Sequence, residues 1–264
     1  MFAAKFFSFV VLATAAAAAP RGRRLSERLA RRAEGSHLSR PVQLIEHPEL
    51  TNVSNVEYSS NWAGAVISES SGTWKSVTGT FTVPTPKAGS GSGSGSSYSA
   101  SAWVGIDGDT CDTAILQTGV DFTISGSSVS YDGWYEWYPD YAYDFSGISF
   151  SAGDSVRLTV TASSTKAGTA EIENLTTGET VTKSITSSSA LCEEDAEWIV
   201  EDYEEGDSLV PFANFGTVTF TSASATSGSG STGPSGATLI DIEQNNKVLT
   251  SVSTSSSSVT VTYE

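Results

Sequence analysis

From residue 57 onward, apolar and polar residues alternate with the two-residue period of strands that bury one face. The clearest alternating segments are 77–83, 155–161, 169–174, 180–185 and 258–263. Glycine and serine turns separate them, and no amphipathic helix pattern interrupts the series. Many short strands at this spacing predict an all-β domain, built as an antiparallel sandwich or barrel.

The first 19 residues have the layout of a secretory signal peptide. A basic start ending at Lys5 precedes an apolar run, Phe6 to Ala19, which ends in small residues before Pro20. The run is too short and too rich in alanine for a membrane anchor, and no later stretch is apolar enough to be a transmembrane helix. We therefore expect a secreted, extracellular protein with no membrane partner.

Residues 20–56 form a basic segment ahead of an acidic body. The segment holds seven arginines and both histidines of the chain, His37 and His47. Residues 57–264 have the size of one domain and carry 26 acidic against 6 basic residues, a net charge of −20. The pairing predicts a propeptide at 20–56 that binds the catalytic domain at 57–264 as an intramolecular inhibitor. A basic tail that is only solvated is the alternative.

The acidic body also bears on partners and working conditions. Nucleic-acid binding needs clustered lysine and arginine, so we expect no nucleic-acid partner. In acid, many carboxylates are protonated and the repulsion among them is relieved. The composition therefore fits a protein that works in acid.

The residue types present narrow the available chemistry. No histidine follows His47, so the body lacks the base for Ser-His-Asp or Cys-His catalysis and the usual ligand of zinc. Cys111 and Cys192 are the only cysteines, and an even count in an exported protein predicts a disulfide. Carboxylates, amides and hydroxyls remain, and we expect neither a metal nor a cofactor.

Four segments place acids or an amide beside aromatic residues on one face of a predicted strand. The same-face pairs are Trp103 with Asp107, Gln117 with Asp121, Asp132 with Glu136, and Glu197 with Glu201. Such a mixture is typical of a substrate groove, but a half-exposed surface with satisfied tryptophans would give the same pattern. The alternation alone leaves both interpretations open.

Six longer motifs, in this order along the chain, resemble the glutamic peptidases, or eqolisins. They are Tyr58-Ser-Ser-Asn-Trp-Ala-Gly-Ala-Val66, Ala102-Trp-Val-Gly-Ile-Asp-Gly-Asp-Thr-Cys111, Ala114-Ile-Leu-Gln-Thr-Gly119, Tyr135-Glu-Trp-Tyr-Pro139, Glu173-Asn-Leu-Thr-Thr-Gly178 and Ala196-Glu-Trp-Ile-Val-Glu-Asp-Tyr-Glu-Glu205. The resemblance implies a two-sheet antiparallel β-sandwich of the concanavalin A-like or jelly-roll type with a groove on one face. It also implies a fungal, secreted endopeptidase that is active in acid on protein or peptide substrates, and we expect a monomer.

The resemblance also assigns roles. Glu201 would act as general base and then general acid, and Gln117 would donate a hydrogen bond to the oxyanion. Positions that line or support the site are Trp103, Asp107, Asp121, Asp132 and Glu136, and Cys111 and Cys192 fall on a disulfide position. Because glutamate has a reference pKa of about 4.3, the base should operate near pH 4 or below.

A β-sandwich fold by itself is also compatible with other functions. A lectin-like sandwich would bind sugar with the same tryptophans and acids, and a glycoside hydrolase would use two carboxylates. Neither alternative requires the pair Gln117 and Glu201. Low-complexity stretches at 89–97 and 227–236 are expected to be surface loops. Asn52-Val-Ser and Asn174-Leu-Thr match the glycosylation sequon, a triplet that is common by chance.

Overall fold

The computed structural model describes residues 37–46, 56–90 and 97–264, so the predicted signal peptide and most of the predicted propeptide lie outside the described residues. The described residues contain 20 strands and no helix. In chain order the strands are β1 His37–Leu38, β2 Val56–Ser59, β3 Trp62–Ser68, β4 Trp74–Thr82, β5 Ser97–Ile106, β6 Ile115–Ser125, β7 Ser128–Tyr138, β8 Tyr143–Asp144, β9 Ser155–Ser164, β10 Ala167–Asn174, β11 Glu179–Thr186, β12 Asp195–Glu201, β13 Glu204–Glu205, β14 Ser208–Leu209, β15 Thr217–Ser227, β16 Gly230–Thr232, β17 Thr238–Gln244, β18 Lys247–Val248, β19 Thr250–Thr254 and β20 Ser258–Tyr263. No helix in this part of the chain is long and apolar enough to cross a membrane.

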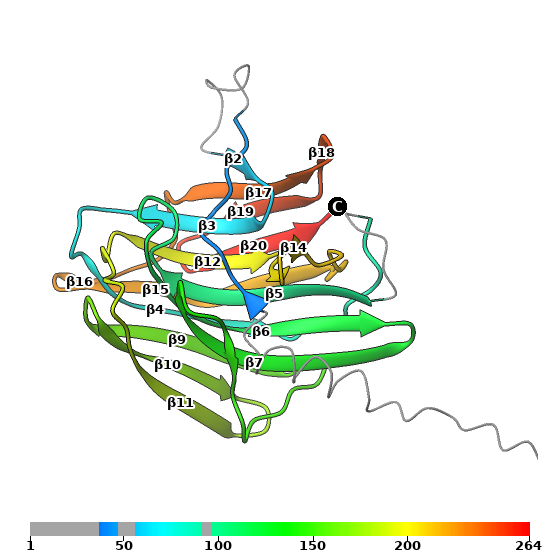
Figure 1. Ribbon diagram of the computed structural model, residues 1–264, viewed down its shortest axis with the longest axis horizontal. Helices are drawn as coiled ribbons and strands as arrows, with labels where there is room; N and C mark the ends of the chain where they lie inside the picture. The colour runs from blue at the N-terminus through cyan, green and yellow to red at the C-terminus, as the bar shows by residue number, and fades with distance from the viewer. Residues whose placement is uncertain (1–36, 47–55, 91–96) are drawn as a thin grey trace, which may run out of the picture.

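Two large sheets pack face to face, as Figure 1 shows. One has the strand order β11-β10-β9-β4-β15-β20-β19, with β16 beside β15; the other has β18-β17-β3-β12-β5-β6-β7-β8, with β2 beside β17. A small third sheet joins β1, β13 and β14. The predicted two-sheet sandwich is therefore confirmed, with one departure: β2 and β17 pair in parallel, so the sheets are not wholly antiparallel.

The space between the two sheets is filled by one alternate row of side chains from each strand. Val104, Leu116 and Trp198 extend inward from the second sheet, and Phe81 and Phe220 meet them from the first. All five are buried, and burial of side chains of this size stabilises the fold by roughly 1.5–3 kcal/mol each.

The opposite row of the second sheet faces away from this core, yet it is also buried. A second apolar cluster lies there and contains Trp62, Trp103, Trp134 and Ile199, with Val42 packed against it. Every residue of β12 is buried, including those on its outer face. Residues 37–42, which we call the covering segment, account for this burial: the blue chain crosses in front of this sheet in Figure 1.

All five strands predicted from alternation are present, as β4, β9, β10, β11 and β20. The predicted loop at 227–236 is in part a hairpin, because β16 folds back on β15. The sequon at Asn174, whose use the sequence left open, lies at a buried side chain. Asn174 is fully buried, and its amide nitrogen donates to the oxygens of Ser149 and Asp154 at 2.9 Å each. Asn174 is therefore inaccessible to glycosylation in the folded protein.

Candidate active site

Strand register brings the predicted site residues into two rows on the outer face of the second sheet. Because β7, β6, β5 and β12 are consecutive neighbours, residues in register lie side by side. The first row is Glu136, Gln117, Gly105 and Glu197, and the second is Asp132, Asp121, Ser101 and Glu201. Gln117 and Glu201, which are 84 positions apart in sequence, thus share one face with a single strand between them.

Trp103 fixes one oxygen of Glu201. Its indole nitrogen donates to Glu201 Oε2 at 2.9 Å, and its ring meets Trp62 edge-on at 4.9 Å between centroids. The ring has room only because its neighbours lack side chains. A Cβ at Gly105 would lie 2.8 Å from Trp103 Cζ3, and one at Gly119 would lie 2.6 Å from Trp103 Cβ.

The covering segment crosses both rows and presents its backbone to them. Gln117 Nε2 donates to the carbonyl oxygen of Ser39 at 3.1 Å. The backbone N–H of Ser39 donates to Glu136 Oε2, also at 3.1 Å. The two side chains therefore hold one residue of an extended peptide from both sides, through groups that every peptide possesses.

Side chains of the covering segment are held as well. His37 is fully buried, stacks on Tyr203 at 4.3 Å between centroids and places Nδ1 3.5 Å from Asp121 Oδ2. His37 and Leu38 also pair with β13 in an antiparallel bridge. One residue beyond Ser39, Arg40 forms an ion pair with Glu204 at 2.6 Å.

With the segment in place, both carboxyls near Ser39 favour their neutral form. Burial raises the pKa of Glu201 to about 8, an effect that the polar groups of Ser39, Trp103 and Trp62 only partly oppose. Burial also raises the pKa of Glu136 well above its usual range, and the nearby charge of Glu201 adds to the rise. Exposure of this face to water would remove the burial that raises the pKa of both carboxyls.

The two remaining predicted acids lie away from Ser39. Asp107 has a left-handed backbone (φ 72°), and its carboxylate accepts the backbone N–H groups of residues 192–195 at 2.7–3.3 Å. It therefore supports the loop before β12. Asp132 lies at the outer end of its row, beside Asp121, and is partly exposed.

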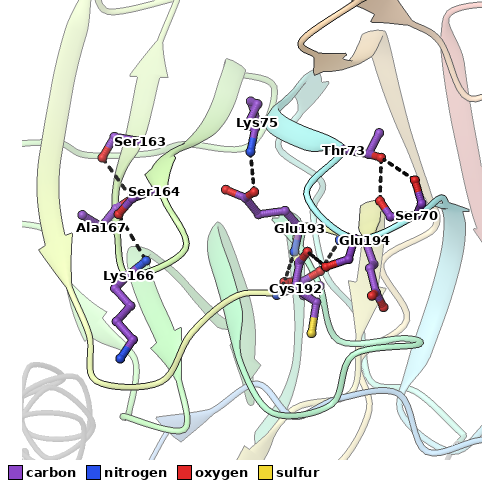
Figure 2. A network of polar contacts seen from close by, with 12 residues as sticks. Ser70, Thr73, Lys75, Ser163, Ser164, Lys166, Ala167, Cys192, Glu193 and Glu194 are labelled. Atoms are coloured by element: carbon purple, nitrogen blue, oxygen red, sulfur yellow. Dashed lines mark hydrogen bonds and ion pairs between the residues drawn. The ribbon is translucent and has the colours of Figure 1, made fainter.

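The loop that Asp107 holds is fastened at two further points. The predicted disulfide is present and joins Cys111 to Cys192 across a sequence separation of 81. Figure 2 shows the Lys75 ammonium directed at the carboxylate of Glu193, with which it forms an ion pair. Among the described residues, the one grouping of metal-ligand type is Asp107 with the two cysteines. Their sulfurs are bonded to each other and offer no thiolate to a metal.

Two residues of the site, Trp62 and Tyr203, were not among those predicted from the sequence. Trp62 pairs in register with Glu201, and its indole helps to lower the pKa of that carboxyl. Tyr203 follows β12 and stacks on His37. Trp62 lies within the first of the six motifs and Tyr203 within the sixth, and membership of these motifs was the only available signal. Tyr203 follows the end of β12, so alternation could not place it.

Comparison with known proteins adds a second line of evidence. Residues 60–263 match the model of the peptidase A4 family. The chain is 54% identical to aspergillopepsin-2 of Aspergillus niger over 96% of each chain, and 43% identical to scytalidopepsin B of Scytalidium lignicola over 98% of each chain. It is also similar in structure to scytalido-glutamic peptidase crystallised with a transition state analog inhibitor. That match has a TM-score of 0.70 and 44% identity, and covers 78% of this chain and 98% of the other.

Proposed function

Because the chain belongs to the peptidase A4 family and is a glutamic endopeptidase, we propose that Glu201 and Gln117 carry its chemistry. One observation supports this proposal above the rest: Gln117 Nε2 donates to a backbone carbonyl, that of Ser39. A substrate carbonyl in the same place would receive the same hydrogen bond. That bond strengthens when the carbonyl oxygen becomes an oxyanion.

The reaction then follows from the two side chains. With a substrate in place of the covering segment, the ionised Glu201 takes a proton from a water molecule, whose oxygen attacks the carbonyl carbon. The carbonyl oxygen gains the negative charge and is stabilised by Gln117. Glu201 returns the proton to the amide nitrogen, the C–N bond breaks, and an acid and an amine leave. None of these steps requires a metal or a cofactor.

Three neighbours support this chemistry. Trp103 holds Oε2 of Glu201 and favours its ionised form. Glu136 accepts the N–H of the residue whose carbonyl is attacked, as it does for Ser39. Asp121 lies beside His37 and receives a hydrogen bond from Trp134 at 2.7 Å, so it belongs to a pocket that takes a side chain of the bound peptide.

We further propose that the covering segment is the inhibitory part of the propeptide at 20–56. It occupies the position that the mechanism gives to substrate, and it seals Glu201 from water. With a pKa raised to about 8, a sealed Glu201 stays protonated in acid and cannot act as a base. Removal of the segment would restore both water and an ionisable base.

We also propose that the protein is secreted. The layout of residues 1–19 and the disulfide between Cys111 and Cys192 both suit an exported protein. We propose that the mature enzyme is the domain at 57–264, acting as a monomer. Intact mass before and after acidification would locate the maturation cut.

Substrate class can be tested against the carbohydrate alternative. The purified chain is brought to about pH 3.5, where an unperturbed glutamate begins to ionise, and is then given casein, haemoglobin and a soluble β-glucan. We expect both proteins to be cut at internal bonds and the glucan to remain intact. Release of reducing sugar without cleavage of either protein would contradict the proposal.

A further inference from the structure

Glu197 is a buried carboxyl beside Gln117 that the proposed mechanism does not use. The two residues flank Gly105 in register on β12 and β6 and extend toward the same side of the sheet. A Cβ at Gly105 would lie 2.6 Å from Glu197 Oε1 and 3.4 Å from Gln117 Cβ. The carboxyl therefore leans over Gly105 toward Gln117, through space that only a glycine leaves free.

Both side chains have polar atoms that no protein group satisfies. The two oxygens of Glu197 and the Oε1 of Gln117 are buried without a hydrogen-bond partner among the described residues. Such atoms cost free energy unless they bond to each other or to an enclosed water molecule. The Nε2 of Gln117, by contrast, is engaged with Ser39.

The surroundings of Glu197 favour its neutral form. Burial raises its pKa well above the usual range, and the nearby carboxylates of Asp195, Asp107 and Asp109 raise it further. No basic group contributes. A neutral carboxyl carries an O–H that can donate, whereas a carboxylate can only accept.

We propose that Glu197 is a positioning residue whose O–H donates to Gln117 Oε1, directly or through one water molecule. This bond fixes which end of the Gln117 amide faces the substrate carbonyl. An ionised Glu197 would instead attract Nε2 and turn the amide, which removes the donor from the oxyanion. The inference rests on the proposed role of Gln117.

Glu136 is the nearest competitor for this role, because it lies opposite Gln117 on β7. Its Oε2, however, accepts the N–H of Ser39, so this carboxyl already serves the bound peptide. Neither oxygen of Glu197 forms a hydrogen bond with the covering segment or with any other described residue, which leaves this carboxyl available to orient Gln117.

The test compares acid-activated Glu197→Gln and Glu197→Leu with the wild-type enzyme on one peptide substrate across the active pH range. Gln can donate at every pH, so Glu197→Gln should keep kcat within about threefold in acid and hold its activity at least about one pH unit further toward neutral. Leu cannot donate, so kcat should fall about tenfold or more while KM changes less than about twofold. Tryptophan fluorescence at each pH reports folding.

Two controls separate the possible outcomes. Asp241→Asn changes another buried carboxyl, outside both rows, and should leave the upper limit of activity where it is. Glu201→Gln tests the proposed function itself and does not depend on Glu197. If Glu197→Gln retains the wild-type upper pH limit, or if Glu197→Leu folds and keeps full kcat, the positioning role is wrong even though the peptidase proposal stands. If Glu197→Leu does not fold, the pH profile of Glu197→Gln decides alone.

Discussion

The indole N–H of Trp103 lies 2.9 Å from Glu201 Oε2 and stabilises the ionised form of that carboxyl. Trp103 therefore influences the pH range in which Glu201 is ionised and can act as a base. Since the hydrogen bond lowers the pKa of Glu201, its loss should raise that pKa. Glu201 would then ionise only at higher pH.

Trp103→Phe should therefore shift the acid limb of kcat toward higher pH and lower the maximal kcat about tenfold. A hydrogen bond to a charged group is worth about 1.5–3 kcal/mol, and each 1.36 kcal/mol is a factor of ten in rate. The pH dependence of kcat on a peptide substrate measures both effects. Trp137→Phe is the matched control, because the Trp137 indole donates to Ser189 on the core side. An unshifted acid limb in Trp103→Phe would contradict this account.

For individual residues, the sequence predicted which side chains share one face of a strand, because side chains alternate between the two faces with a period of two. It correctly grouped Gln117 with Asp121, and Asp132 with Glu136, on one face of their strands. It did not foresee that Asp107 leaves its strand, since a left-handed backbone at an aspartate is a local property that alternation does not encode. The free space at Gly105, on which Glu197 depends, also emerges only from three-dimensional packing.

The covering segment is the element whose position the sequence did not predict. Residues 37–42 show no alternation, and their contacts lie with Gln117, Glu136 and Tyr203, which are far away in the chain. The basic character of residues 20–56 did predict an attraction to the acidic body. Charge pattern can therefore indicate a partner, but hydrogen-bond geometry is needed to locate its binding site.

A synthetic peptide of residues 37–44 should inhibit the mature enzyme, because its backbone at Ser39 can bond Gln117 and Glu136 as the covering segment does. The contacts of Arg40 with Glu204 and of His37 with Asp121 should strengthen this binding. A peptide with alanine in place of His37 and Arg40 should therefore inhibit more weakly. Inhibition constants of the two peptides at one pH measure the effect. Equal inhibition by both peptides would contradict a role for these two side chains in holding the segment.

For the whole molecule, buried carboxyls make stability depend on pH. Burial raises the pKa of Asp107 and of Asp241 to about 6, and that of Glu201 to about 8 with the segment bound. Each folded pKa exceeds the unfolded value near 4, so the folded state holds more protons between the two values. The stabilisation is complete below about pH 4 and is lost as the pH rises through 6 toward 8.

The melting temperature should therefore fall as the pH is raised from about 4 to about 7. For a domain of this size, each kcal/mol lost lowers Tm by about 2–4 °C. Calorimetry at several pH values measures the slope. In Asp241→Asn the group no longer titrates, so the decline between about pH 4 and 6 should be shallower than in wild type. A wild-type Tm that is constant or rises over this range would contradict the argument.

The overall architecture followed from the sequence more completely than the site did. Five alternating strands and the family motifs were enough to predict a sandwich, because each strand must bury one face against another sheet. The parallel contact of β2 with β17 was not predictable, since β2 is short and joins a strand far along the chain. The same holds for β16, whose glycines and serines resemble a loop.

The most direct test of the central claim is kcat for a peptide substrate, measured across acid pH for folded, segment-free Glu201→Gln and Glu136→Gln. Glutamine keeps the shape of Glu201 but cannot accept the proton, so Glu201→Gln should fall to near background at every pH. Glu136→Gln should be weakened and shifted in its pH profile but remain active, because an amide oxygen can still accept the substrate N–H that Glu136 receives from Ser39. If Glu201→Gln retains substantial kcat while Glu136→Gln loses it, the base is Glu136 and the assignment of Glu201 is wrong.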